Sequence, residues 1–137
     1  MSRDKQIYEA QRWLGTAMED LDAARALLEK QKFSHSCFFS QQSAEKTLKA
    51  LWIFFGEDPW GHSIHKLMTE FPDPQTRELF EEVIEEGSVL DRYYIPTRYP
   101  SGLPDMTPGK YYFQKDALLC IASAERILDK VCTIMKK

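Results

Sequence analysis

Arginines and tyrosines gather in one short segment of the chain, residues 90–100, which reads LDRYYIPTRYP. Guanidinium groups bind phosphate through paired hydrogen bonds, and aromatic rings stack on nucleic-acid bases. We therefore predict that Arg92 and Arg98 hold an anionic ligand. Tyr94 or Tyr99 would stack on a base of the same ligand.

The charges around this segment favour an anionic ligand, although they leave a second interpretation open. Between Arg92 and Lys115 there are four basic residues and a single acidic one, Asp105. A positive region on an otherwise acidic chain attracts anions. In the alternative interpretation, the arginines pair with Asp91 or Glu45 and only pin the loop.

A second polar group lies within a segment expected to form a buried helix. Gln41 interrupts an otherwise apolar seam, and Glu45 lies one turn beyond it. A buried amide or carboxylate without partners costs several kcal/mol. We therefore predict that Gln41 and Glu45 orient the arginines of the loop, with Lys46 as a further ligand-binding residue. Alternatively, Gln41 is a satisfied core amide, and Gln42, Lys46 and Lys49 form a solvated face.

Other catalytic and metal-binding patterns are weak. His62 and His65 could place two ligands on one helix face, but no nearby carboxylate or cysteine completes a metal site. Either histidine is better explained as a hydrogen-bonding residue at the start of a helix. The chain has no Gly-x-Ser-x-Gly elbow and no glycine-rich phosphate loop. We predict no metal, no cofactor and no covalent nucleophile.

Heptad-like spacing of apolar residues predicts long helices around these groups. In the first helix, the apolar positions from Ile7 to Leu28 alternate steps of three and four, and its alanines permit a close neighbour. A second helix is expected from about His35 to Phe55, with Ser34 as its cap and Gly56 as its stop.

Local signals mark the elements that follow. Ser63 is expected to cap a short helix that runs to Glu70, and Asp73 followed by Pro74 starts another helix. One stripe of this helix holds Phe80, Val83, Gly87, Leu90 and Tyr94. The glycine within the stripe predicts close backbone contact.

Prolines separate this helix from the last one. Four of the seven prolines fall between Pro96 and Gly109, so this stretch is predicted to be irregular. The last helix is expected from about Gln114. No segment shows sustained period-two alternation. We predict an all-α fold, an antiparallel up-and-down four-helix bundle over residues 1–137, with an additional short helix and a Pro-rich loop before the last helix.

Composition and charge limit the classes of function. The net charge of -3 argues against a protein that binds DNA through an overall positive charge. No apolar run approaches the roughly 20 residues needed to span a bilayer. The three cysteines match neither a zinc pattern nor a disulfide framework. We expect a cytoplasmic protein that does not bind membranes.

The second helix and the loop together resemble a known family. The stretch SCFFSQQSAEKTLKAL at residues 36–51, followed by YIPTRYP at residues 94–100, is similar to the HEPN domain, named for higher eukaryotes and prokaryotes nucleotide-binding. The resemblance covers nearly the whole chain in the same order. It implies an all-α bundle that is often homodimeric, binds nucleotides or RNA, and is frequently encoded beside a small nucleotidyltransferase, in a toxin–antitoxin-like arrangement.

Some members of that family are metal-independent ribonuclease toxins, which use an arginine followed after four to six residues by a histidine. Counted from Arg92, the matching positions are Thr97, Arg98 and Tyr99. None of these side chains exchanges a proton near neutral pH as imidazole does. We therefore predict a non-catalytic nucleotide- or RNA-binding domain. The alternatives are a ribonuclease with a divergent active site and a pure protein-interaction module.

Large aromatic residues favour a homodimer whose interface adjoins the loop. Trp52, Trp60, Phe54 and the loop tyrosines supply more aromatic surface than one small bundle readily buries. Interfaces between proteins are enriched in such residues.

Overall fold

The computed structural model describes residues 2–94, 97–103 and 105–136. In chain order its helices are α1 (Arg3–Glu29), α2 (Phe33–Phe54), α3 (Ile64–Thr69), α4 (Pro74–Leu79), the 3₁₀ helix η1 (Phe80–Val83), α5 (Ile84–Asp91), the 3₁₀ helix η2 (Pro100–Gly102), α6 (Pro108–Tyr111) and α7 (Gln114–Met135). These described residues contain no strand, and the predicted all-α fold class is confirmed.

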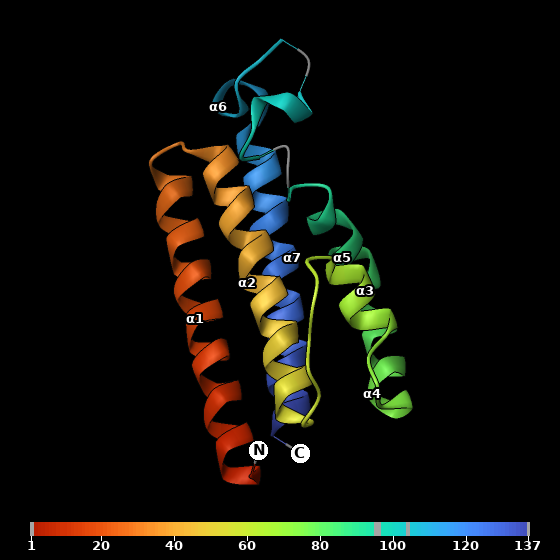
Figure 1. Ribbon diagram of the computed structural model, residues 1–137. Coiled ribbons are helices and arrows are strands. Elements are labelled where there is room, and N and C mark those ends of the chain that lie inside the picture. Colours follow the sequence, from red (N-terminus) through yellow and green to blue (C-terminus); the bar gives the residue numbers. More distant parts are fainter. Residues whose placement is uncertain (1, 95–96, 104, 137) are drawn as a thin grey trace.

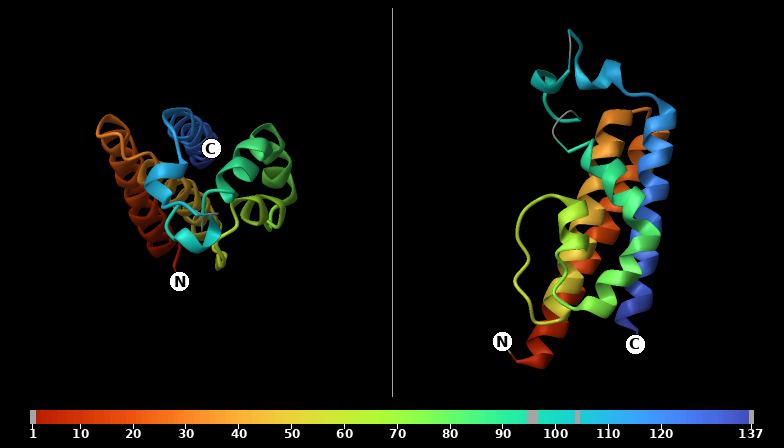
Figure 2. Two further views of the ribbon diagram at one scale, coloured as in Figure 1. Left: turned by 90° about the horizontal axis from the view of Figure 1, so that it is seen from above. Right: turned by 90° about the vertical axis from the view of Figure 1, so that its right-hand side faces the viewer.

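The long helical segments of the bundle run alternately up and down the molecule (Figure 1). α1 rises and α2 descends beside it, the run of α4, η1 and α5 rises, and α7 descends against both α2 and α5. The short helix α3 packs against α5. The segment that contains η2 and α6 covers one end of the bundle, as both views in Figure 2 show.

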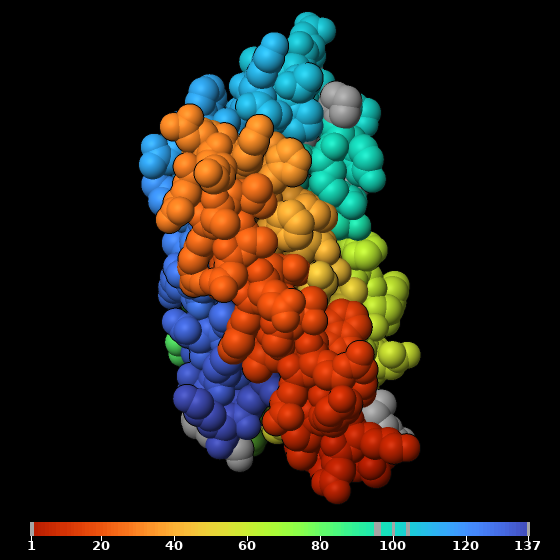
Figure 3. All heavy atoms as spheres, turned by 90° about the vertical axis from the view of Figure 1, so that its left-hand side faces the viewer, coloured from red at the N-terminus to blue at the C-terminus, as the bar shows by residue number. Residues whose placement is uncertain are grey.

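Small residues bring α1 and α2 close together. Ala10, Ala17 and Ala24 of α1 are fully buried, as the spacing predicts. The hydroxyls of Ser36 and Ser43 donate to the carbonyls of Ala24 and Ala17, each at 2.7 Å. Each of these two buried hydroxyls thus finds its acceptor on the facing helix, so close packing leaves both paired. On the face shown in Figure 3, α1 lies in front and α7 lies along one edge.

The start of α2 differs from the prediction. Ser34 does not cap the helix, because α2 already begins at Phe33 and Ser34 is buried inside its first turn. The backbone reverses one turn earlier, at Gln31, which has a positive φ of 60°. At the other end, Gly56 follows α2 with a φ of 79°, as its predicted role as a stop requires.

The caps of the next two helices follow the prediction. The Ser63 hydroxyl accepts a hydrogen bond from the Lys66 N–H at 3.1 Å, and the Asp73 carboxylate accepts one from the Thr76 N–H at 3.0 Å. Pro74 occupies the first turn of α4.

The predicted fourth helix is interrupted, although its buried stripe is present. Phe80, Val83, Gly87 and Leu90 all lie in the interior. Val83 leaves helical geometry, with φ of -125° and ψ of 17°, so the run divides into α4, η1 and α5.

Candidate functional site

The guanidinium of Arg98 lies against three aromatic rings. Its central carbon is 4.8 Å from the ring centroid of Phe38, 4.9 Å from that of Tyr94 and 5.0 Å from that of Tyr99. We call these four residues the Arg98 cluster. Cation–π contacts hold an arginine in place while its N–H groups stay available to a ligand. Arg98 and Tyr99 are exposed, whereas Phe38 and Tyr94 are partly buried.

The turn that carries this arginine is held by the residue before it. Thr97 is buried, and its hydroxyl donates to the backbone carbonyl of Tyr93. The phenol of Tyr93 in turn donates to the Asp116 carboxylate at the start of α7, at 3.0 Å. Burial is the main reason that the pKa of Tyr93 lies above its ordinary range. Both contacts fix the loop from within, which leaves Arg98 directed outward.

Arg92 lies two residues before Tyr94 in the chain but has different surroundings. It lines a surface hollow of about 300 Å³ together with Tyr93, Tyr111, Tyr112 and Asp116. Its side chain is exposed and makes no hydrogen bond or ion pair with any described residue. Arg92 is thus free to bind an anion.

The carboxylates that were alternative partners for these arginines are engaged elsewhere. Asp91 accepts hydrogen bonds from the Ser63 hydroxyl at 2.9 Å and from the backbone N–H groups of Ile64 and His65 at 2.7 and 3.1 Å. It therefore completes the N-terminus of α3, where a negative charge is favourable. The alternative in which Asp91 pins an arginine is not the arrangement observed.

Gln41 and Glu45 form a buried polar network on α2. Gln41 is fully buried, and its amide donates to Glu45 Oε1 at 3.2 Å and accepts from Gln42 at 2.8 Å. Glu45, only 4% exposed, accepts from Lys49 Nζ at 3.1 Å and contacts His62 Nδ1 at 3.2 Å. Gln41 is thus a satisfied core amide, and its buried position in the seam follows the sequence analysis.

The sequence analysis expected this network to orient the arginines, but it does not. Neither Gln41 nor Glu45 makes a hydrogen bond or ion pair with Arg92 or Arg98 within the described ranges. The reason is the register of α2. Its residue at the level of Arg98 is Phe38, whereas Gln41 and Glu45 lie one and two turns further along and face the loop before α3.

His62 connects the network to the Arg98 cluster. Its ring stacks on that of Tyr94, with centroids 5.0 Å apart and an angle of 19° between the planes. The Arg98 cluster and the buried polar network of α2 are therefore linked through one ring contact, between His62 and Tyr94. Sequence reasoning assigned His62 to a helix start, but the helix cap is Ser63, and His62 pairs with a carboxylate distant in sequence.

Lys46 lies apart from this surface. Its ammonium pairs with Asp20 of α1 at 2.6 Å and lines a hollow of about 560 Å³ beside Arg12, Trp13 and Glu19. It points to the α1 side because it is one residue beyond Glu45, about 100° around the helix. Lys46 is therefore not brought together with the other predicted site residues.

Two contributors to the surface were not predicted. Phe38 was not among the predicted site residues, and His62 was not placed near the arginines. The spacing of Phe38, Gln41 and Glu45 at three and four residues could have indicated a shared helix face. Residues 55–63 return along α2, which places His62 beside Glu45 (Figure 2). No local sequence pattern predicts this course of the loop.

The described residues hold no group of three or more histidine, cysteine, aspartate or glutamate side chains arranged to bind a metal ion. Within the same ranges, no helix has both the length and the apolar character that a membrane crossing requires.

Comparison with known proteins shows the family. The HEPN domain profile matches residues 10–135. The chain is 27% identical over 141 residues to a protein of Methanocaldococcus jannaschii named "Putative toxin MJ1304", and the match covers 96% of this chain and 91% of that protein.

Solved structures of similar proteins have the same fold. TT1696 from Thermus thermophilus is 35% identical, with a TM-score of 0.86, over 90% of this chain and 96% of that one. ST0689, described as an archaeal HEPN homologue, is also 35% identical, with a TM-score of 0.77, over 92% and 97% of the two chains. A HEPN domain protein from Thermotoga maritima is 27% identical, with a TM-score of 0.68, over 92% and 98%.

Proposed function

The chain belongs to the HEPN domain family, and on that premise we propose that it binds a nucleotide or RNA at the surface formed by Arg92 and the Arg98 cluster. One observation carries the proposal. Two exposed arginines lie close together in the chain, and neither has an anionic partner among the described residues. Guanidinium groups with free N–H donors bind phosphate in a bidentate manner.

The aromatic residues support a ligand that also carries bases. Tyr99 is exposed beside Arg98, and Tyr94 presents a partly exposed ring. Base–aromatic stacking contributes about 1–3 kcal/mol per base and tolerates any sequence. Arginine and tyrosine together thus suit a phosphate and the adjacent base.

Replacing each arginine with alanine tests the proposal. We expect Arg98→Ala and Arg92→Ala to weaken binding of a fluorescently labelled single-stranded RNA, measured by anisotropy. A hydrogen bond to a charged group contributes about 1.5–3 kcal/mol, so each loss corresponds to roughly tenfold or more in affinity. Raising the salt concentration should weaken binding of the RNA more than that of ATP, because RNA releases more counterions.

Arg25→Ala provides the matched control. Arg25 is an exposed arginine that pairs with Asp22 and Glu125 on another face, so its loss should leave RNA affinity unchanged. A wild-type protein that binds neither RNA nor ATP would refute the proposal, and it would leave a pure interaction module as the better explanation.

We also propose a toxin-like role in a homodimer, with a small nucleotidyltransferase as a further partner. The name of the Methanocaldococcus jannaschii relative supports the toxin-like role. Exposed apolar side chains near the covered end of the bundle support the homodimer. Growth arrest on expression, relieved by the protein encoded next to this chain, is the expected outcome in cells.

A further inference from the structure

Two hollows lie in series along α1, away from the Arg98 cluster. One has a volume of about 560 Å³ and the other of about 430 Å³, and Glu9 and Trp13 line both of them. We call the two hollows together the α1 groove. Among the described residues, none of α7 lines this groove, although α7 packs on α1 and α2. Figure 2 shows α7 and the loop of residues 55–63 on opposite sides of α2. The pair of α1 and α2 is thus covered by α7 on one side and hollowed on the other.

Gly15 lines the groove without a packing reason in its own chain. A Cβ on Gly15 would meet nothing within 4 Å, whereas a Cβ on Gly87 would lie 3.1 Å from Ile64. A glycine inside a helix is less favourable than alanine, because it loses more backbone entropy on folding. The missing side chain leaves room for another backbone to approach α1 closely.

Trp13 is the half-buried aromatic residue that both hollows share. Its ring makes no aromatic or cation–π contact, and its indole N–H makes no hydrogen bond, with any described residue. Trp52 differs, because its indole N–H donates to the Leu67 carbonyl at 2.9 Å. Ile53 and Pro59 extend the apolar lining beside Trp13. A tryptophan of this kind packs its ring on a partner and donates its N–H to it, which is why tryptophan is enriched at interfaces.

The unpaired charges along the groove are all negative. Each basic side chain of its lining already has a carboxylate partner: Arg12 pairs with Glu9 at 2.7 Å, Lys46 with Asp20 at 2.6 Å and Lys49 with Glu45 at 3.1 Å. Glu19 lines one hollow, and Glu57 and Asp58 line the other. These three carboxylates are exposed and make no ion pair or side-chain hydrogen bond with any described residue. The groove is therefore complementary in charge to a basic partner.

We propose that the α1 groove binds a basic amphipathic helix of another protein. The apolar stripe of that helix packs on Trp13, and its backbone approaches α1 at Gly15. Its arginine or lysine side chains pair with Glu19 in one hollow and with Glu57 and Asp58 in the other. A helix whose apolar face lies in a groove is a common mode of peptide recognition.

The length of the groove fits such a helix. The part of α1 that lines it, residues 6–19, extends about 20 Å at a rise of 1.5 Å per residue. A partner helix of about 13 residues has the same length. The inference does not depend on nucleotide binding, because the Arg98 cluster shares no residue with the groove.

A designed peptide provides the direct test. It is a fluorescein-labelled amphipathic helix of about 16 residues, with leucine at every third or fourth position and arginine toward both ends. A second peptide carries glutamate in place of each arginine. We expect the arginine peptide to bind the full chain in anisotropy titrations and the glutamate peptide not to bind, because only the first complements the free carboxylates.

Gly15→Gln separates docking from support of the fold. The added side chain occupies the groove, so we expect affinity for the arginine peptide to fall by about tenfold or more. The variant should unfold in no less urea than the wild type, because glutamine favours a helix more than glycine does and the Cβ meets nothing within 4 Å. Unchanged affinity of a folded Gly15→Gln protein would overturn the proposal.

Paired charge variants test the complementarity. We expect Glu19→Gln combined with Glu57→Gln to lower affinity for the arginine peptide by roughly three- to tenfold. Glu78→Gln combined with Glu81→Gln is the control, because it makes the same change in net charge at exposed carboxylates on another face. An equal loss in both double variants would show non-specific attraction and overturn the proposal.

Three further results would count against a helix of another protein. The arginine peptide would fail to bind at concentrations up to about 1 mM, a very weak affinity for a specific complex. Spermine would displace the peptide at the same concentration as unlabelled peptide does, which would assign the groove to small organic cations. Peptide binding would release a monomer from a dimer in light scattering, which would assign the groove to a second copy of this chain.

Discussion

The imidazole of His62 stacks on the ring of Tyr94, with centroids 5.0 Å apart and planes inclined by 19°. This contact joins a loop that follows α2 to a loop that follows α5. On one side of it lies the buried carboxylate of Glu45, and on the other the guanidinium of Arg98. His62 thus joins the buried carboxylate to the aromatic ring that carries the surface arginine.

Tyr94 should contribute to RNA affinity through its ring and not through its hydroxyl. We expect Tyr94→Ala to lower affinity for single-stranded RNA by roughly tenfold, since base–aromatic stacking contributes about 1–3 kcal/mol. Tyr94→Phe should bind as the wild type does. Anisotropy titrations with the labelled single-stranded RNA check both variants, and a Tyr94→Ala protein with unchanged affinity would remove Tyr94 from the binding surface.

The pair of Glu45 and Lys49 should dominate the stability of α2. Both side chains are largely buried, so Glu45→Leu leaves an ammonium without its partner and should cost about 3–5 kcal/mol in the free energy of unfolding. The double variant Glu45→Leu with Lys49→Met removes both charges and should recover part of that loss. Urea unfolding of Glu45→Leu, Lys49→Met and the double variant measures the three values. A double variant as unstable as the sum of its single changes would show that the charges do not interact.

The periodic and local parts of the fold could be predicted from the sequence. The alanine and leucine seam of α1 repeats over many residues, and the caps at Ser63 and Asp73 depend only on neighbours within one turn. The cap at Ser34 was wrong because the chain reverses at Gln31, and a left-handed residue other than glycine has no clear sequence signal.

The site was only partly predictable, because its contacts join distant segments. The loop residues of the Arg98 cluster could be predicted from their residue types alone. Their partner Phe38 could not, because its position depends on the register of α2 against that loop. Glu45 was predicted to need a buried partner, and the partners are Lys49 and His62. The position of His62 depends on the course of residues 55–63, which no periodicity specifies.

Alkaline conditions should destabilise the fold through buried phenols. Burial raises the pKa of Tyr112 to about 12, whereas an unfolded tyrosine titrates near 10. Between these two values the unfolded state has lost a proton that the folded state keeps. Stability is therefore complete below about pH 10 and falls as pH rises toward 12, by at most about 1.4 kcal/mol per pH unit for this tyrosine. Tyr112→Phe should show a shallower decline in urea unfolding across this range, and identical slopes would contradict the assignment.

A homodimer should form through the apolar surface next to the loop. Phe113, at the start of α7, is 61% exposed, and Leu118 and Leu119 follow it on the same helix. Of the aromatics expected at an interface, Trp60 is 78% exposed, whereas Trp52 donates to the Leu67 carbonyl at 2.9 Å and packs into the protein's own core.

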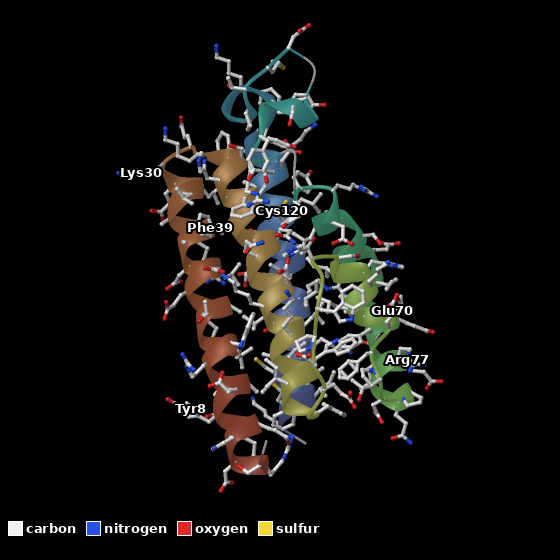
Figure 4. The ribbon with its side chains drawn as sticks, in the orientation of Figure 1. Tyr8, Lys30, Phe39, Glu70, Arg77 and Cys120 are labelled. Carbon is white, nitrogen blue, oxygen red and sulfur yellow. The ribbon has the colours of Figure 1, made fainter. Side chains whose placement is uncertain are left out.

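Light scattering should give twice the 16.0 kDa of the chain, and Phe113→Ser should shift the protein toward the monomer. The matched control is Tyr8→Ser, which removes an exposed aromatic from the far end of α1 (Figure 4). A wild-type mass of 16.0 kDa across micromolar concentrations would rule the dimer out.

Two glycines in helices should respond to alanine in opposite directions. A Cβ on Gly87 of α5 would lie 3.1 Å from Cγ2 of Ile64 and 3.2 Å from Sδ of Met68, whereas a Cβ on Gly15 of α1 would meet nothing within 4 Å. Both changes gain helix propensity, about 0.5–1 kcal/mol. At Gly87 the added methyl group presses α3 away from α5, and overpacking costs about 1–3 kcal/mol, so we expect a net loss of about 1 kcal/mol. Gly15→Ala should instead stabilise the protein. Urea unfolding measures the change in the free energy of unfolding for each variant, and changes of the same sign would show that α3 does not pack closely on α5.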